Sequence, residues 1–276
     1  MQLALKNSKK LNLSLNESRL EARFILEHVL KITQKEIIEK NSQLLERKDQ
    51  AKIQSITEKR ISGIPLPYLL GEWSFYGRTF KVNRNVLIPR ADTEVLIEKV
   101  LSKINKHDTF HILDLGCGTG IIGITLALER QLSKVILIDQ SEDALKNTKE
   151  NLALHQTPNI TIQKSDWFTS LAKTKFDVIV SNPPYLEEND PHLLEDLEHE
   201  PINALISGAA GMTAIAHIIE HAKNHMNRDA WLFIEHGYNQ AEITKDLFEK
   251  NGYQHIEHAK DIHGIHRVTF GQYSIV

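Results

Sequence analysis

From about residue 91 onward, short β-branched segments alternate with segments of helical length, and this alternation restricts the possible folds more than any other feature. Strands separated by helices of roughly 10–15 residues are typical of a parallel sheet that carries helices on both faces. The sequence therefore predicts an α/β domain with a doubly wound, mostly parallel sheet. The expected strands cover residues 111–115, 134–139, 160–163, 176–181, 230–235 and 268–270, and the expected helices cover 92–104, 121–130 and 142–155.

The first 64 residues have a different, helical pattern, with no proline and a single glycine, Gly63. Ser14 and Glu17 have the spacing of a capping box, so a helix is expected to begin there. Apolar residues then recur at the spacing of one helix face, namely Ala22, Ile25, Leu26, Val29 and Leu30.

These patterns divide the chain into parts. Residues 1–70 are predicted to form a small N-terminal helical-bundle domain. An aromatic and β-branched stretch follows around Gly77, which predicts a β-hairpin linker over residues 71–90. The α/β domain then covers residues 91–276.

Charge is distributed unevenly between these parts. Residues 1–60 hold 13 Lys/Arg and 8 Asp/Glu, a net +5, whereas the remainder holds 20 and 28, a net −8. The excess of lysines is explained either by ordinary solvated helix surfaces or by a basic docking face for an acidic or RNA-associated partner.

Cysteine use and hydropathy indicate the compartment. The only cysteine, Cys117, excludes an internal disulfide framework and suits a reducing environment. No apolar run approaches the roughly 18 residues that a membrane span needs. We therefore expect a cytoplasmic protein without a membrane partner.

The predicted strand 111–115 leads into a glycine-rich turn, Gly116-Cys117-Gly118-Thr119-Gly120. Glycine at such a turn lets the backbone approach a ligand closely. Asp139 ends the next strand, where a carboxylate can accept hydrogen bonds from both hydroxyls of a ribose. Dinucleotide-binding turns place the third glycine one residue later, so the spacing favours a nucleoside without a pyrophosphate, such as S-adenosylmethionine. The alternative is that these glycines serve only tight packing.

Two further candidates follow the third strand. Asp166 is placed to accept a hydrogen bond from an adenine amino group, and Trp167 to cover an adenine ring, because ligands in this architecture bind at the carboxyl edge of the sheet. Trp167 is equally compatible with a position in the hydrophobic core.

The most specific motif is Asn182-Pro183-Pro184-Tyr185, directly after the fourth strand. The prolines remove two N–H donors and fix two φ angles, which leaves nearby carbonyl groups free to accept. The side-chain carbonyl of Asn182 and the main-chain carbonyl of Pro183 suit the two hydrogens of a planar NH2 group. Tyr185 offers a ring that can stack on a flat amide or base. The motif therefore predicts methylation of an amide or amine nitrogen.

Taken together, these residues resemble the release factor glutamine methyltransferase (PrmC/HemK) family. Ala91 stands where the family usually has proline, and Cys117 where it usually has a small polar residue. Further matching segments are Pro67–Glu72, Phe75–Gly77, Val86–Arg90, Asp92–Glu94, Asp114–Gly120, Glu200–Pro201, Ala204–Leu205, Glu235–Gly237, Asp261 and Arg267–Val268.

The resemblance implies a Rossmann-like S-adenosylmethionine-dependent methyltransferase domain and an N-terminal substrate-recognition domain. The substrate would be the glutamine in the Gly-Gly-Gln loop of class I peptide chain release factors, and the product N5-methylglutamine. Asn182, Pro183 and Tyr185 would be catalytic, and Asn182 through Tyr185 would bind the substrate. The cofactor-binding residues would be Gly116, Cys117, Gly118, Thr119, Gly120, Asp139, Trp167 and Asn182.

Several other functions fit parts of the pattern. The tetrapeptide also suits the exocyclic amine of a nucleic-acid base, but the chain lacks a strong basic patch near the catalytic half, so no stable nucleic-acid binding is expected. A methyltransferase acting on a ribosomal-protein glutamine, a cofactor-binding module without catalysis and a hydride-transferring dehydrogenase are further alternatives. His217, His221 and His225 recur at metal-ligand spacing, but we expect a solvated helix face and no metal.

Overall fold

A computed structural model of the chain describes residues 11, 13–39, 44–191, 193 and 197–274. The chain divides into two compact units, Met1–Glu72 and Trp73–Val276. Within the described ranges, none of the helices combines the length and the apolar character needed to cross a membrane.

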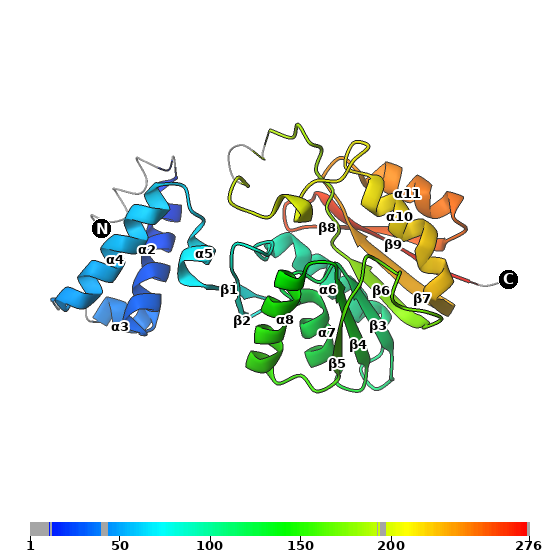
Figure 1. The fold of residues 1–276 in the computed structure, drawn as a ribbon, viewed down its shortest axis with the longest axis horizontal. Helices are drawn as coiled ribbons and strands as arrows, with labels where there is room; N and C mark the ends of the chain where they lie inside the picture. The colour runs from blue at the N-terminus through cyan, green and yellow to red at the C-terminus, as the bar shows by residue number, and fades with distance from the viewer. Residues whose placement is uncertain (1–10, 12, 40–43, 192, 194–196, 275–276) are drawn as a thin grey trace. The chain divides into compact units, whose positions relative to one another are not determined.

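The first unit is helical, as its sequence predicts (Figure 1). The expected capping box is confirmed, because Ser14 Oγ accepts from Glu17 N at 3.2 Å and Glu17 Oε2 accepts from Ser14 N at 2.8 Å. Both groups satisfy N–H donors that a helix start leaves without partners. The helices are α2 (Leu15–Leu30), α3 (Gln34–Glu39), α4 (Arg47–Ile61) and α5 (Leu66–Leu70).

A small hydrophobic core joins three of these helices. Ile25 of α2, Ile53 of α4 and Leu66 of α5 are buried against one another. At the edge of this core, the Arg60 guanidinium donates to the Glu21 carboxylate from two nitrogens, at 3.0 to 3.2 Å. The amphipathic face predicted for α2 is therefore the face that packs on α4.

The chain then forms a two-stranded sheet from β1 (Glu72–Phe75) and β2 (Arg78–Lys81), followed by the α/β unit. Its strands are β3 (His111–Leu115), β4 (Lys134–Asp139), β5 (Ile160–Lys164), β6 (Phe176–Ser181), β7 (Met226–Glu235), β8 (Gln254–Lys260) and β9 (His266–Tyr273). The α-helices are α6 (Glu94–Lys103), α7 (Ile121–Glu129), α8 (Glu142–His155), α10 (Thr213–Ala222) and α11 (Ala241–Lys250). Short 3₁₀ helices cover η1 (Ala91–Thr93), η2 (Ile202–Ala204) and η3 (Lys223–His225).

The seven strands form one sheet in the order β5-β4-β3-β6-β7-β9-β8. Strands β5, β4, β3, β6 and β7 are parallel, and β9 runs antiparallel to both β7 and β8. The predicted doubly wound, mostly parallel sheet is therefore confirmed. Strand β8 and helix α11 were not predicted, and the predicted strands cover only the C-terminal part of β7 and the central part of β9.

Helices cover both faces of this sheet (Figure 1). Along β4, Val135 and Leu137 join the core under α6 and α7, whereas Ile136 and Ile138 face the core under α10 and α11. Successive side chains of a strand point to opposite faces, so a strand buried on both sides has a continuous apolar sequence.

The order of the strands positions the site. The chain leaves β3 toward β4 and β5 on one side and later returns to β6 on the other side. Ligands in open α/β sheets bind beyond the carboxyl ends of the strands at such a reversal. The turns that follow β3, β4, β5 and β6 all lie at this edge of the sheet.

Candidate active site

The turn after β3 depends on glycine because its backbone is left-handed. Gly116, Gly118 and Gly120 have φ values of 72°, 55° and 81°. A side chain disfavours this conformation, which glycine adopts freely. The amides of Gly116 and Cys117 both donate to Ile138 O, at 2.8 and 2.9 Å, so the end of β4 fixes the turn.

Asp139 stabilises the same turn with its carboxylate. Its Oδ2 accepts from Gly118 N at 2.9 Å and its Oδ1 from Ser141 N at 2.8 Å. An ionised carboxylate has about four acceptor positions, so each oxygen retains capacity for a further donor. Burial raises the pKa of Asp139 above its ordinary value, against the lowering effect of these amides.

Helix α8 supports the turn from the other side. Thr148 Oγ1 donates to Gly118 O at 2.8 Å, and Asn151 Nδ2 donates to Thr119 O at 2.9 Å. Both side chains are buried, so the carbonyls they bind cannot be solvated instead. The turn is therefore held rigidly before any ligand binds.

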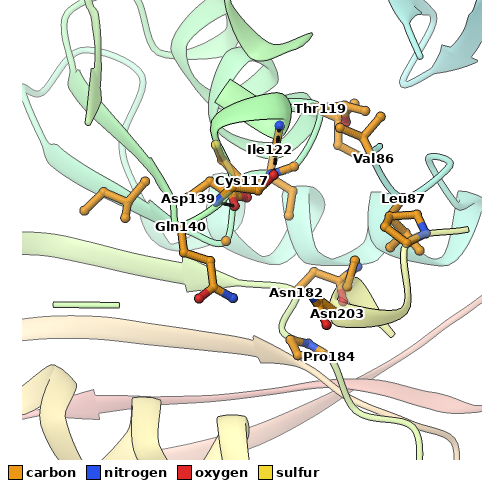
Figure 2. Close-up of a pocket in the computed structure, with 18 of the residues that line it drawn as sticks. Val86, Leu87, Cys117, Thr119, Ile122, Asp139, Gln140, Asn182, Pro184 and Asn203 are labelled. Atoms are coloured by element: carbon orange, nitrogen blue, oxygen red, sulfur yellow. Dashed lines mark hydrogen bonds between the residues drawn. The ribbon is translucent and has the colours of Figure 1, made fainter. Parts of the chain in front are cut away.

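A cavity of about 460 Å³ opens beside this turn (Figure 2). Most of the predicted cofactor-binding residues line it, together with Asp166 and Pro184 of the other predicted segments. Those residues are Gly116, Cys117, Gly118, Thr119, Asp139, Trp167 and Asn182.

Gly120 is the exception, because it lines neither this cavity nor the second cavity described below. A Cβ atom at Gly120 would lie 2.9 Å from Thr148 Cγ2 and 3.0 Å from Ile124 Cδ1. The structure therefore places this glycine at the start of α7, where close packing requires it.

Trp167 lies both against the hydrophobic core and in the wall of the cavity, the two positions considered for it. Its ring is partly buried against the core that includes Phe168, and it also lines the cavity beside Gly116. Its backbone is left-handed, with φ of 44°. A conformation unusual for a large residue indicates that the surrounding structure holds the ring in this place.

The segment Val86–Arg90, predicted to be part of a linker, forms one wall of the cavity. Glu200 holds it, because its carboxylate accepts from Ile88 N at 2.9 Å and forms an ion pair with Arg90. Glu200 is buried, so this pairing compensates a charge removed from water. The contact joins residues more than a hundred positions apart, and no local pattern in the sequence predicts it.

The Asn182–Tyr185 segment lies between this cavity and a second one of about 610 Å³. Asn182 lines both cavities, Pro184 the first and Tyr185 the second. Pro183 is buried and lines neither. Burial raises the pKa of Tyr185 above its ordinary value, so its phenol stays protonated.

The side chain of Gln240, which sequence reasoning missed, fixes the end of this segment. Gln240 Nε2 donates to Tyr185 O at 2.9 Å, and its Oε1 accepts from Gly237 N at 2.8 Å. A Cβ atom at Gly211 would lie 2.1 Å from the same Tyr185 oxygen. The backbone of Tyr185 is therefore held between two segments from later in the chain.

The three histidines at helical spacing do not form a metal site. His217 and His221 stack with ring centroids 4.1 Å apart, whereas His225 stacks on Phe168 at 5.0 Å. Among the residues that the structure describes, no group of three or more His, Cys, Asp or Glu is arranged to hold a metal ion.

Comparison with protein families gives two matches. Residues 91–252 match the methyltransferase small domain, and residues 6–71 match the PrmC N-terminal domain. Among solved structures, a methyltransferase from Pyrococcus furiosus has a TM-score of 0.55 and 16% identity, covering 82% of this chain and 98% of that chain. A likeness at this identity supports the fold alone, and the predicted methyltransferase fold is confirmed.

Relatives of higher identity cover most of the chain. The release factor glutamine methyltransferase of Vibrio cholerae serotype O1 is 40% identical over 260 residues, which are 92% of this chain and 90% of the relative. That of Escherichia coli (strain K12) is 37% identical over 217 residues, 78% of each chain. The chain belongs to the release factor glutamine methyltransferase family.

Proposed function

We propose that this chain transfers a methyl group from S-adenosyl-L-methionine to the side-chain amide nitrogen (N5) of the glutamine in the Gly-Gly-Gln motif of class I peptide chain release factors. The products are N5-methylglutamine and S-adenosylhomocysteine. One observation carries the proposal: Asn182 lies where a cavity beside the glycine-rich turn meets a second cavity lined by Tyr185.

The first cavity suits the cofactor. Asp139 retains acceptor positions for the ribose hydroxyls, and a Cβ atom at Gly118 would meet nothing within 4 Å, so there is room beside the backbone. Trp167 and Asp166 provide a ring and a carboxylate for the adenine. When bound, S-adenosylmethionine supplies an electrophilic methyl group.

The second cavity suits the glutamine side chain. An amide nitrogen is a weak nucleophile because its lone pair is delocalised, so catalysis depends on orientation and on charge stabilisation. The Asn182 side-chain carbonyl accepts a hydrogen bond from one N–H group of the substrate. The Pro183 main-chain carbonyl is the acceptor proposed for the other, although Pro183 lines neither cavity before the substrate binds. These acceptors stabilise the positive charge that develops on the nitrogen before one of its protons leaves. Tyr185 stacks on the planar amide.

In this proposal, the N-terminal unit binds the release factor. The basic excess of residues 1–60 is a feature of that unit and suits an acidic surface on the partner. The single cysteine of this chain suits a reducing cytoplasm, where we place the reaction. No stable binding of nucleic acid is required.

Mass spectrometry of a release factor incubated with the protein and S-adenosylmethionine tests this function. The expected result is one added methyl group on the glutamine of the Gly-Gly-Gln motif. RNA and DNA are incubated in parallel with a radiolabelled methyl donor. Label in a nucleic acid and none in the release factor would overturn the proposal.

Asn182→Ala tests the role of the central residue in the same assay. Loss of an acceptor that stabilises developing charge should lower kcat by at least about 100-fold. The Kd for S-adenosylmethionine should change far less, because the other lining residues remain. Turnover close to that of the unmodified chain would refute the role given to Asn182.

A further inference from the structure

The Asn182 side chain has two possible orientations with opposite chemistry. One presents its carbonyl oxygen to the substrate, and the other, related by a half turn, presents its NH2 group. In the second orientation, the NH2 group of Asn182 would place its hydrogen-bond donors opposite the NH2 donors of the substrate glutamine, so no hydrogen bond could form between them. Some other part of the protein must therefore select the orientation with the carbonyl toward the substrate.

Thr93 provides the first contact that makes this selection. Asn182 Nδ2 donates to Thr93 Oγ1 at 3.3 Å. Thr93 belongs to η1 and is 1% exposed, so its hydroxyl is held inside the protein. A hydroxyl can accept one hydrogen and donate its own. The Thr93 proton is thus free to bind a further acceptor.

Glu235 offers a buried carboxyl group as that further acceptor. It ends β7, whose residue Ile234 pairs with Ser181 of β6, so its carboxyl group lies beside the start of the Asn182 segment. Its side chain is 1% exposed, and its Oε2 has no hydrogen-bond partner among the described residues, so a buried acceptor lies beside Asn182. The donors on Thr93 and Asn182 act on this carboxyl group, because they lower its pKa. An ionised carboxylate only accepts, so both partners must turn their hydrogens toward it.

We propose that Glu235 and Thr93 are positioning residues that bind the NH2 group of Asn182 and so fix its carbonyl oxygen toward the glutamine amide. The inference rests on the proposed function for its consequence in turnover. Neither residue needs to touch the substrate or the cofactor methyl group. The arrangement also polarises Asn182, because a negative charge behind its NH2 group makes its carbonyl a stronger acceptor.

The charged surroundings of Glu235 make this arrangement sensitive to pH. Burial raises its pKa to about 7, hydrogen bonds from Thr93 and Asn182 lower it, and Asp92 and Arg267 act in opposite directions. Tyr185, the other titratable group facing it, stays protonated. Arg267 is paired with Asp92 at 3.1 Å and with Asp261 at 2.9 Å, so it is only partly available to Glu235.

The test compares isosteric variants. Thr93→Val removes the hydroxyl that contacts Asn182. Thr244→Val is its matched control, because Thr244 is also buried and its hydroxyl has no hydrogen-bond partner within the described residues. Glu235→Leu removes the acceptor, and Glu235→Gln keeps one acceptor oxygen without the charge. For each variant, kcat and KM with release factor and the Kd for S-adenosylmethionine are measured.

We expect Thr93→Val and Glu235→Leu to lower kcat by about 10- to 100-fold, the cost of a misplaced catalytic group, while the Kd stays within about two-fold. Glu235→Gln should recover part of this loss. The fall in kcat of the unmodified enzyme below about pH 7 should be absent in Glu235→Gln. Unchanged kcat in both Thr93→Val and Glu235→Leu, or an equal loss in Thr244→Val, would overturn the inference.

A second measurement does not depend on turnover. In the ¹⁵N-labelled protein, the two side-chain NH2 signals of Asn182 should shift with pH around 7, and the shift should disappear in Glu235→Gln. Signals that do not respond to pH would overturn the inference. If the unmodified enzyme fails to methylate release factor, the proposed function fails, and this titration still decides whether Glu235 binds Asn182.

Discussion

Asp139 connects the structure of the glycine-rich turn with the proposed binding of the cofactor. Each of its oxygens accepts a main-chain N–H group, from Gly118 and from Ser141. A carboxylate held in this way has a fixed orientation, and its remaining lone pairs point in defined directions. Its position at the end of β4 follows from the sequence pattern, whereas its bond to Gly118 depends on how the turn folds back.

Asp139→Ala should therefore weaken cofactor binding. Losing a charge-assisted hydrogen bond costs on the order of 1.5–3 kcal/mol, which corresponds to an increase in Kd of about 10- to 100-fold. Isothermal titration with S-adenosylmethionine measures this change. Asp166→Ala is a control at the same cavity and should have a smaller effect, because the turn amide Gly118 N binds Asp139 and not Asp166. Equal affinity of Asp139→Ala and the unmodified chain would contradict the role of Asp139.

Asp114 gives a prediction about pH and stability. Its Oδ2 accepts from Gly123 N at 2.9 Å, and its Oδ1 has no partner among the described residues. Burial raises its pKa from 3.8 to about 7. The folded chain therefore holds this proton over a range in which the unfolded chain has lost it.

Because the folded-state pKa is raised, the stability from protonated Asp114 is complete below about pH 4 and is lost as the pH rises through about 7. Asp114→Asn keeps an acceptor for Gly123 and does not titrate. Urea unfolding at several pH values should show that the unmodified chain loses stability relative to this variant, by on the order of a few kcal/mol, between about pH 4 and pH 8. A difference that is constant with pH would show that Asp114 is not buried as a neutral acid.

Among the elements, helix α7 packs closely on the sheet at Gly123, which has no side chain. A Cβ atom at Gly123 would lie 1.9 Å from Leu137 Cδ2 of β4. Alanine normally stabilises a helix by about 1 kcal/mol relative to glycine. At this position the clash should exceed that gain, because overpacking a core costs about 1–3 kcal/mol.

We expect Gly123→Ala to lower the Tm. Adding Leu137→Ala should relieve the clash, so the double variant should be more stable than the sum of the two single effects. Differential scanning calorimetry of the four proteins measures this coupling. A higher Tm for Gly123→Ala alone would be inconsistent with the close packing of α7 on β4.

Several strands of the sheet could be predicted from the sequence, and others could not. The strands β3, β4 and β6 were predicted within one residue, because a strand buried on both faces is apolar throughout and ends at a glycine, aspartate or asparagine. Strand β8 was missed because it lies at the edge of the sheet and most of its residues are polar or charged, with only Ile256 and Ala259 apolar. The wall formed by Val86–Arg90 was treated as a linker because Glu200, which holds it, is distant in the sequence.

For the whole molecule, the uneven charge of the chain supports the proposal that the first unit contributes to binding the release factor and the second unit carries the reaction. Lys9 and Lys10, which contribute to the basic excess of residues 1–60, lie outside the described residues. Lys31 has a side chain that is 70% exposed and lies 4.0 Å from Glu72. Its charge is therefore largely accessible to a partner.

Reversing the charge of Lys9, Lys10 and Lys31 to glutamate should raise the KM for release factor several-fold and leave the Kd for S-adenosylmethionine unchanged. The effect should diminish at high salt, because exposed charges are screened. Arg228→Glu is the matched control, since that side chain is 80% exposed and lies in the other unit. An unchanged KM in the triple variant would show that the basic face does not contribute to substrate binding.

The sequence by itself determined the class of the fold, the helical first unit and the residues at the carboxyl edge of the sheet. These features depend on local periodicity and on short motifs, which act within a few residues of one another. The three-dimensional packing was needed to show that Gly120 packs under α8, that Glu200 holds the cavity wall, and that Thr93 binds Asn182. Those contacts join segments up to 112 residues apart, and they form only when the sheet and its helices pack together.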